Sequence, residues 1–269
     1  MIYRWRTLYP EHWHMLANMM EENYATADNA GSTMVFGLYS FHSCTKLREM
    51  FNSNHLIVYQ AEPLVPNHWW STDLILKNLE GADEVWDYDL ENIEILKKHG
   101  INAKYKPPRY AESLKTVKNV ENPDIDVLFY GSLTERRSKF LSTFLMNSII
   151  PHEDEQIWLN ANFVFVNNCF GAKLDEYIAR SKIVLNLNPY DGECRQQQTR
   201  IFYNLINNKC VLSEQNKFNY YGDMIVEFEN NNTQHMFHQI INLLRDDKWK
   251  LYANDNYKHF CKGQLVENN

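Results

Sequence analysis

The chain has 269 residues, of which 44% are hydrophobic and 23% are charged, as is usual for a globular protein with a real core. Its net charge of −7 argues against a protein that coats nucleic acid non-specifically. No run of eighteen apolar residues and no signal-peptide stretch occurs, so neither a membrane span nor a leader is expected. The five cysteines are widely spaced and form no C-x-x-C pair, which favours a reduced, cytoplasmic protein without a zinc site.

Strand-like and helix-like segments alternate in the first part of the chain. Strands are predicted at 33–40, 55–62, 82–86 and 102–106. Helices are predicted at 44–52, 67–80 and 89–100, the last ending at Gly100. Apolar strands separated by helices are typical of a parallel sheet that helices cover on both faces.

The polar stretch 107–123 has no clean period and carries prolines at both ends, so it is predicted to be a linker. The alternation then resumes. Strands are predicted at 125–131, 162–166, 182–188 and 209–214, and helices at 135–149, 172–180, 195–208, 233–247 and 249–261. The sequence therefore predicts an α/β protein with two Rossmann-like domains, 1–115 and 116–269, whose parallel sheets face a central cleft.

The segment "DVLFYGSLTERRSKFL" (126–141) suggests an anion site. A buried strand stops at Gly131-Ser132, and a helix follows that carries Arg136 and Arg137 near its start. The N-terminus of a helix binds phosphate readily, and a glycine lets the backbone approach a ligand closely. An arginine can grip a diphosphate with two parallel hydrogen bonds. A tight turn with two surface arginines is the alternative, since neither G-x-G-x-x-G nor a Walker lysine is present.

A second polar cluster follows the strand predicted at 182–188. Its loop and the next helix start hold Asp191, Glu193, Gln197, Gln198 and Arg200. Ligands of open α/β sheets bind at the carboxyl ends of strands, and amides with an arginine suit the hydroxyls and phosphates of a nucleotide sugar. A capped helix with a polar first turn is the alternative interpretation.

Several acidic pairs imitate metal-binding motifs. Asp87 and Asp89 form a D-x-D sequence but open a helix, where N-capping explains them, and Asp124 and Asp126 stand at a strand entrance. We therefore expect no metal. A basic strip between 97 and 118, with Lys104, Lys106 and Arg109, is either a solvated surface or a landing site for phosphates.

Three segments in this order and spacing, "DIDVLFYGSLTERR", "LDEYIARSKIVLNLN" and "QQTRIFYNLINNKCVLSE", resemble the second domain of GT-B nucleotide-sugar glycosyltransferases, of the group-1-like bacterial and phage type. "IVYQAEPL" and "ADEVWDYDLENIEILKKHGINAKYKP" resemble the first domain. The resemblance covers about residues 55–215. It implies a GT-B fold, a donor nucleotide held mainly by the second domain and a final helix that returns to the first.

The resemblance also assigns roles to residues. Gly131, Ser132 and Arg136 would meet the diphosphate, and Gln197, Gln198 and Arg200 would stand where family members often show Glu-Gln before an arginine. Gln197 stands where family members often have the glutamate. It is therefore in doubt whether a carboxylate binds the ribose of the donor, unless Glu193 or Glu214 does so. An inverting reaction needs a base from the first domain, and Glu62 and His42 lie at the ends of its strands.

The expected activity is metal-independent transfer of a sugar, a hexose or a pentose, from a nucleotide-diphosphate donor, with UDP preferred. Two acceptor classes stay open: hydroxymethylcytosine in phage DNA, which the basic strip favours, and a surface-glycan precursor, which the acidic net charge favours. A non-catalytic nucleotide- or sugar-binding module on the same fold is the alternative function. The sugar, the stereochemical outcome and the oligomeric state do not follow from the sequence.

Overall fold

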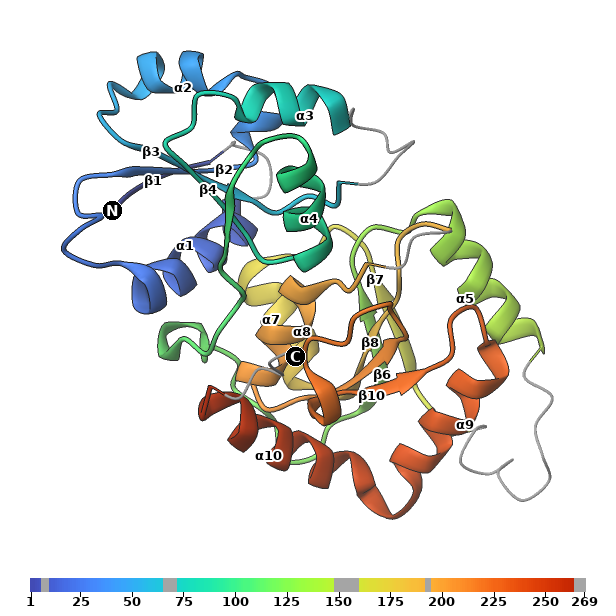
Figure 1. Cartoon of the computed structure of the whole chain (residues 1–269). Coiled ribbons are helices and arrows are strands. Elements are labelled where there is room, and N and C mark those ends of the chain that lie inside the picture. The colour runs from blue at the N-terminus through green and yellow to red at the C-terminus, as the bar shows by residue number, and fades with distance from the viewer. Residues whose placement is uncertain (6–9, 65–71, 148–159, 192–194, 264–269) are drawn as a thin grey trace. The chain divides into compact units, whose positions relative to one another are not determined.

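The computed structural model describes residues 1–5, 10–64, 72–147, 160–191 and 195–263. The chain divides into two compact units, Met1–Pro108 and Arg109–Asn269. Each unit is a five-stranded sheet with helices, and Figure 1 shows their elements along the chain. All neighbouring strands in both sheets are parallel.

The first unit has its strands side by side in chain order, β1-β2-β3-β4-β5. The strands are β1 (Ile2–Trp5), β2 (Thr33–Phe36), β3 (Leu56–Gln60), β4 (Glu84–Asp87) and β5 (Ala103–Tyr105). The helices are α1 (Pro10–Tyr24), α2 (Cys44–Phe51), α3 (Thr72–Leu79) and α4 (Leu90–Lys98), with a 3₁₀ turn η1 (Leu38–Ser40). Among the described strands of this unit, the order never reverses direction.

Alternate residues of these strands supply two apolar faces. Val35, Val58 and Val85 join the buried cluster that α2, α3 and α4 complete. On the other face Phe36 stacks near Trp13 of α1, with ring centroids 6.4 Å apart. Figure 1 shows α2 and α3 above the sheet and α1 below it. The sheet is therefore buried on both sides, which explains why its strands are continuous apolar runs.

The second unit has the strand order β10-β9-β8-β6-β7. The strands are β6 (Ile125–Tyr130), β7 (Phe163–Val166), β8 (Ser181–Asn186), β9 (Cys210–Glu214) and β10 (Val226–Phe228). The helices are α5 (Glu135–Asn147), α7 (Gly171–Ala179), α8 (Gln198–Ile206), α9 (Thr233–Leu244) and α10 (Lys248–Cys261). Short 3₁₀ turns are η2 (Glu112–Leu114), η3 (Gly222–Met224) and η4 (Arg245–Asp247).

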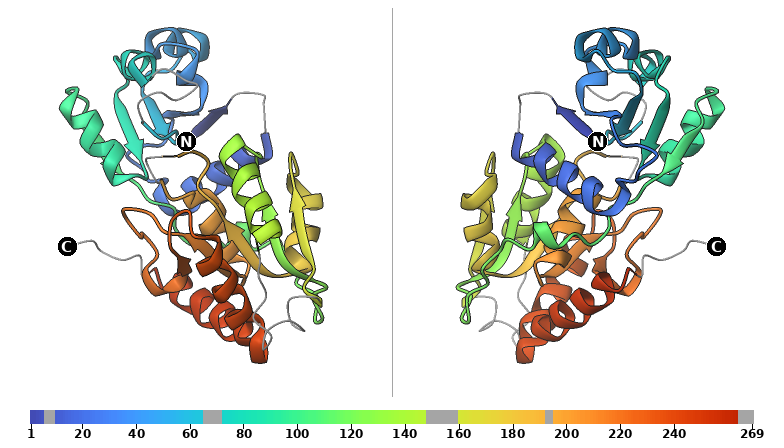
Figure 2. Two further views of the ribbon diagram at one scale, coloured as in Figure 1. Left: turned by 90° about the vertical axis from the view of Figure 1, so that its right-hand side faces the viewer. Right: turned by 90° about the vertical axis from the view of Figure 1, so that its left-hand side faces the viewer.

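Helices cover both faces of this second sheet as well. Val127 and Phe129 of β6 pack in one buried cluster with α5, α9 and α10. Leu128, which points to the opposite face, packs with Leu174 and Ile178 of α7. Figure 2 shows α9 and α10, in orange and red, beside one another at the lower end of this unit. Helix α10 thus packs within the second unit, and its predicted return to the first domain stays a prediction.

Most predicted elements are present, with ends that differ by a few residues. The strand predicted at 33–40 stops at Phe36, because Gly37 has a φ of +66° and a 3₁₀ turn follows it. Among the described strands and α-helices, three were not predicted: β1, α1 and β10. The strands β1 and β10 are only four and three residues long, too short for a clear period.

The stretch predicted as a linker is anchored to the second unit. Asn207, which is buried at the end of α8, accepts from Val117 N (3.0 Å) and donates to Leu114 O (3.0 Å). Its carbonyl oxygen accepts from the Asn119 side chain at 2.9 Å. These bonds explain why the division between the units falls at Pro108, ahead of the boundary at 115 that the sequence suggested.

None of the described helices combines the length and the apolar character that a bilayer crossing requires. Four of the five cysteines lie in the described part of the chain, and all four are free thiols: Cys44, Cys169, Cys210 and Cys261.

Candidate functional site: an arginine cluster at the carboxyl edge of the second sheet

The strand order of the second sheet marks a ligand site. The chain leaves β6 toward β7 on one side and returns to β8 on the other, so the direction reverses between β6 and β8. Ligands of open α/β sheets bind outside the carboxyl ends of strands at such a reversal. The segments that emerge there are Gly131-Ser132, after β6, and the loop 187–191, after β8.

Gly131 allows a side chain to lie directly against the backbone at this edge. Its φ is +128°, and a Cβ built on it would lie 2.4 Å from Nη2 of Arg200. Real Cβ atoms essentially never approach a heavy atom so closely, so a side chain at position 131 would force the end of Arg200 to move. The sequence predicts that a ligand approaches the backbone at Gly131. In the structure, the group that lies there is the side chain of Arg200, from helix α8.

Arg200 is a buried cation without a described carboxylate partner. Its Nη1 donates to Asn186 Oδ1 at 2.8 Å, and its guanidinium lies 5.2 Å from the ring centroids of Phe129 and Tyr130. Its Nε has no hydrogen-bond partner within the described chain. Burial lowers the pKa of Arg200, against a smaller opposite effect of Tyr130. A bound anion would relieve this cost, because an opposite charge favours the protonated form.

Arg137 joins the two segments of the site. Its Nε (3.1 Å) and Nη2 (2.6 Å) donate to Leu187 O, and its Nη1 donates to Ser132 O at 2.9 Å. The Arg137 side chain is buried against Phe129, and its Nη1 lies 3.9 Å from the Cβ position of Gly131. Burial, with Arg200 and Arg136 nearby, lowers the pKa of Arg137. Arg137 thus fixes the spacing between the β6 and β8 segments.

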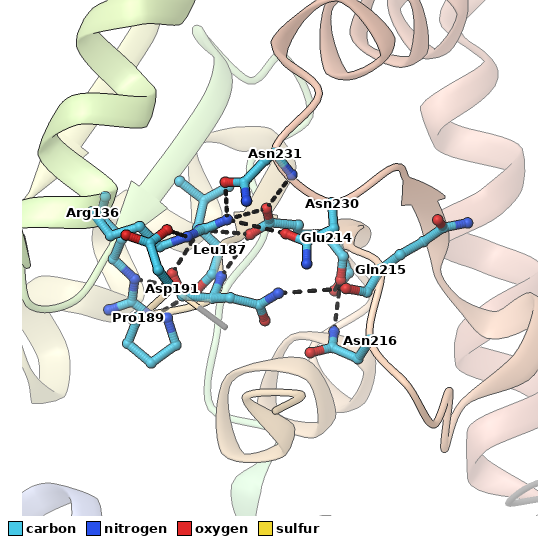
Figure 3. Close-up of polar contacts among 12 residues, drawn as sticks. Arg136, Leu187, Pro189, Asp191, Glu214, Gln215, Asn216, Asn230 and Asn231 are labelled. Carbon is cyan, nitrogen blue, oxygen red and sulfur yellow. Dashed lines mark hydrogen bonds and ion pairs between the residues drawn. The ribbon is translucent and has the colours of Figure 1, made fainter. Parts of the chain in front are cut away.

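Arg136 is held by the protein itself. Figure 3 shows it among acceptors from several segments: Nη1 donates to Asn188 O (2.9 Å) and to Glu214 Oε2 (2.8 Å). Nη2 donates to Glu214 Oε1, Asn230 Oδ1 (3.2 Å) and Asn231 Oδ1 (2.7 Å). The hydrogens of both terminal nitrogens are therefore used. The Nε of Arg136, like that of Arg200, has no hydrogen-bond partner among the described residues. That Arg136 meets the diphosphate stays a prediction.

Glu214 was one of two carboxylates considered for the donor ribose. It is completely buried, and its oxygens also accept from the backbone nitrogens of Asn188 (3.0 Å) and Asn231 (2.9 Å). With Arg136, both oxygens are fully occupied by protein donors. Glu193, the other candidate, lies outside the described residues.

Positive charge dominates the buried part of this unit. Four arginines and one lysine are buried among the described residues after Arg109, against a single buried carboxylate, that of Glu214. The four arginines are Arg136, Arg137, Arg195 and Arg200. Buried charges normally come in pairs, so this excess of buried cations over buried carboxylates among the described residues is unusual for a protein interior.

The remaining predicted residues surround the start of α8. Gln197 is the half-buried N-cap residue of that helix and makes no side-chain capping bond, while Gln198 is buried. The exposed Asp191 places Oδ1 3.4 Å from Nε of Arg136. Ser132 is exposed and contributes its carbonyl to Arg137. All of these lie at the same edge as Arg200 or in the loops that lead to it.

Sequence reasoning missed the amides that support the arginines. Asn186 and Asn188 flank Leu187, and the period-two alternation of a strand could have identified Asn186 as an inward polar group. Gln196 is buried, and its Nε2 has no partner in the described part of the chain. The asparagines 230 and 231 follow β10, a strand too short to predict, so nothing in the sequence connected them to Arg136.

In the first unit the two predicted base candidates lie just beyond 3₁₀ turn η1 and strand β3. The side chain of Gln60 fixes the backbone of Glu62, accepting from its nitrogen at 2.7 Å and donating to its oxygen at 2.6 Å. Asn92 also donates to Glu62 O, at 3.0 Å. His42 is half-buried and its backbone nitrogen bonds Leu38 O at 3.1 Å. Glu62 is thus the more firmly positioned of the two.

The acidic pairs have local roles. Asp89 caps α4 by accepting from Glu91 N and Asn92 N, and Asp87 accepts from Asp89 N at 2.8 Å. The other pair forms ion pairs, Asp124 with Arg180 and Asp126 with Lys182. Among the described residues no group of three or more His, Cys, Asp or Glu is placed to hold a metal ion.

Two lysines of the basic strip contact other residues of the first unit. Lys104 pairs with Glu84 at 2.7 Å. Lys106 is half-buried, with Nζ 4.8 Å from the ring of Tyr24 and 5.0 Å from that of Trp86. Arg109 is exposed and belongs to the second unit.

No protein-family model and no curated protein matches this chain. Solved structures do match. HepE of Anabaena in complex with UDP and glucose has a TM-score of 0.59 at 10% identity, over 87% of this chain and 74% of that one. An alpha-glucosyltransferase in complex with UDP and a 13-mer DNA containing an HMU base has a TM-score of 0.56 at 10% identity, over 87% and 77%.

TarM also matches, with a TM-score of 0.55 at 11% identity over 86% of this chain. This chain spans only about half of TarM, because the match covers 51% of it. These neighbours are GT-B glycosyltransferases. The chain therefore has the GT-B fold, and the prediction of two Rossmann-like domains with parallel sheets is confirmed.

Proposed function

We propose that this protein is a glycosyltransferase that moves a sugar from a nucleotide-diphosphate donor, with UDP as the nucleotide, to a hydroxyl group. The observation that carries the proposal is Arg200, a buried cation with unused donors beside Gly131 where the second sheet reverses direction. The complexes of HepE with UDP and with UDP-glucose support the choice of nucleotide.

The chemistry requires a stabilised leaving group. As the bond between the sugar and the diphosphate breaks, negative charge grows on the diphosphate oxygen. A fixed, water-poor cation stabilises such a charge strongly. Arg200 would supply it, and Arg137, whose Nη1 lies 3.9 Å from the same Cβ position of Gly131, would add to the positive potential. We expect the reaction to be independent of a metal ion, so EDTA should leave the rate unchanged.

The acceptor hydroxyl needs a base if the reaction inverts the anomeric carbon. We assign this role to Glu62, whose backbone is fixed by Gln60 and Asn92. His42 is the second candidate. Glu62→Gln should lower kcat by about 10²–10⁴-fold, the range for a general base, and leave UDP affinity unchanged. Loss of activity in His42→Ala but not in Glu62→Gln would reassign the base.

We propose two classes of acceptor, hydroxymethylated DNA and a glycan, and both are included in the assay below. The neighbour that holds DNA with an HMU base supports hydroxymethylated DNA. The contacts of Lys104 with Glu84 and of Lys106 with Tyr24 and Trp86 support a glycan, because they engage two of the cations of the basic strip. The alternative function is a binding module without turnover, which the glutamines at 196–198 support.

The test is a turnover assay with a panel of UDP-, GDP- and ADP-sugars. Each donor is supplied alone, with a duplex carrying hydroxymethylcytosine, with the unmodified duplex, or with a glycan primer. We expect release of UDP above the enzyme-free rate in the presence of one acceptor, and its loss in Arg200→Ala. Arg180→Ala, which removes an exposed arginine of the same unit, is the matched control. Binding of UDP without turnover on any acceptor would support the module.

A further inference from the structure

The loop after β8 is held at four backbone polar groups between Leu187 and Pro189. Leu187 O accepts from Arg137, Asn188 N donates to Glu214, and Asn188 O accepts from Arg136. Pro189 O accepts from Thr134 Oγ1 at 2.6 Å. A surface loop normally leaves such groups to water. In this loop the protein itself supplies the partners.

The Arg136–Glu214 pair is the common point of these contacts. It joins the start of α5, the loop after β8, the end of β9 and the loop after β10, four segments that meet at the carboxyl edge of one sheet (Figure 3). Glu214 is completely buried and Arg136 is 8% exposed. A buried ion pair with this many hydrogen bonds fixes geometry, although its net contribution to stability is often small.

We propose that Glu214 is a positioning residue of the anion site. It acts through Arg136 and Asn188 and does not touch the ligand. Glu214 accepts from Asn188 N, which belongs to the same peptide group as Leu187 O. It thereby fixes the carbonyl that accepts from Arg137. Arg137 in turn fixes Ser132, the neighbour of Gly131, against which Arg200 lies. The inference rests on the proposed anion site and adds the residue that holds its loop in place.

Two other roles for the pair give opposite results. If Arg136 were itself a phosphate ligand that Glu214 merely competes for, removing the charge of Glu214 would free Arg136 and tighten UDP binding. If the pair served only the stability of the fold, its removal would lower the melting temperature without changing the affinity of the folded protein. Only a positioning role predicts weaker binding by a protein that is still folded.

The experiment compares wild type with Glu214→Gln by calorimetric titration of UDP at a temperature where circular dichroism shows both folded. Glutamine keeps the shape but places an amide donor against Arg136 and two backbone N–H groups. We expect UDP to bind more weakly by at least about tenfold, as is usual when a residue that orients ligand-contacting groups is lost. The exposed Glu176→Gln, in the same unit, should bind UDP like wild type.

A milder variant keeps the test valid if Glu214→Gln does not fold. Asn231 has a φ of +58°, so Asn231→Gly retains the backbone and the N–H bond to Glu214 but removes the Oδ1 that accepts from Arg136. We expect a smaller loss of UDP affinity, about threefold. Unchanged or tighter binding in the folded variants would overturn the positioning role. Failure of wild type to bind any nucleotide would instead refute the proposed function.

Discussion

Arg200 and Gly131 form the contact on which the proposed donor site depends. The guanidinium occupies the space that a side chain at position 131 would need, and the aromatic rings of Phe129 and Tyr130 support it from the sheet. Arg200 therefore keeps an unbonded Nε beside a residue, Gly131, that has no side chain. A single methyl group is therefore enough to disturb it.

Gly131→Ala should displace Arg200 and weaken UDP binding about tenfold or more, because the new Cβ would lie 2.4 Å from Nη2. The control is Gly100→Ala, at a φ of +78° with no atom within 4 Å of the new Cβ. It carries a backbone cost of about 1–2 kcal/mol without moving an arginine. Calorimetry of both variants separates the two effects. Equal UDP affinity in both would mean that Arg200 does not bind the nucleotide.

Lys209 gives a second prediction for a single residue. It is buried, it donates to Ala179 O (3.1 Å) and Ser181 O (2.9 Å), and burial lowers its pKa to about 7. The unfolded chain, with a lysine pKa near 10.4, binds more protons than the folded protein above pH 7. Stability contributed by this group therefore rises with pH from about 7 toward 10.

Lys209→Met should remove this pH dependence. The free energy of unfolding of wild type, measured with urea between pH 7 and pH 9, should rise relative to that of the variant with a slope approaching ~1.4 kcal/mol per pH unit. Taking the difference between the two proteins cancels the cysteines and tyrosines that also titrate there. A difference that stays constant with pH would show that Lys209 keeps its charge in the folded protein.

At the scale of elements, the segment from Arg109 to Pro123 is tied to the second unit by several hydrogen bonds, and those made by the buried Asn207 are the ones that the next prediction tests. Asn207 satisfies Val117 N and Leu114 O with its side chain and is itself buried. The segment has hardly any regular structure, apart from η2. Its order consequently depends on these hydrogen bonds more than on its own sequence.

Asn207→Leu should destabilise the protein by about 1–3 kcal/mol for each buried group left unsatisfied. It should also make the peptide bonds between 109 and 123 accessible to protease. The control is Asn208→Gly. Glycine tolerates the positive φ of Asn208, and the change removes only an exposed hydrogen bond to Asn254. It should change neither the free energy of unfolding nor the rate of cleavage. Cleavage rates that are equal in the two variants would mean that Asn207 does not hold the segment.

The sequence predicted most of these elements and the fold, because long apolar strands alternate with periodic helices. It did not predict β1 or β10, which are too short to show a period. At the site it identified Gly131, Arg137 and Arg200 by their position after a strand or at a helix start. The sequence could not show that Glu214 forms an ion pair with Arg136. The two residues are 78 positions apart, and only the order of the strands in the sheet brings them together.

At the scale of the whole molecule, the two units differ in what they offer a ligand. The second unit carries the reversal of strand order and the excess of buried arginines, whereas the described strands of the first run in unbroken order. Buried polar side chains of the first unit, such as Gln60 and Asp87, bond to each other. The donor nucleotide is therefore expected on the second unit alone.

Hydrogen exchange should show this division. Saturating UDP should slow amide exchange at 131–137, 187–191 and 196–204, because binding to the native state suppresses local opening. Peptides from 1–108 should change little. Protection that falls mainly within 1–108 would move the donor site to the first unit.

The central claim, that Arg200 binds the diphosphate of the donor, is tested most directly by titrating UDP into wild type and Arg200→Ala under identical conditions. The account predicts saturable binding by wild type and a loss of about 1.5–3 kcal/mol in Arg200→Ala, the range for hydrogen bonds to a charged group, with Arg180→Ala unchanged. UDP binding of equal strength in wild type and Arg200→Ala, or no binding of UDP by wild type, would contradict it.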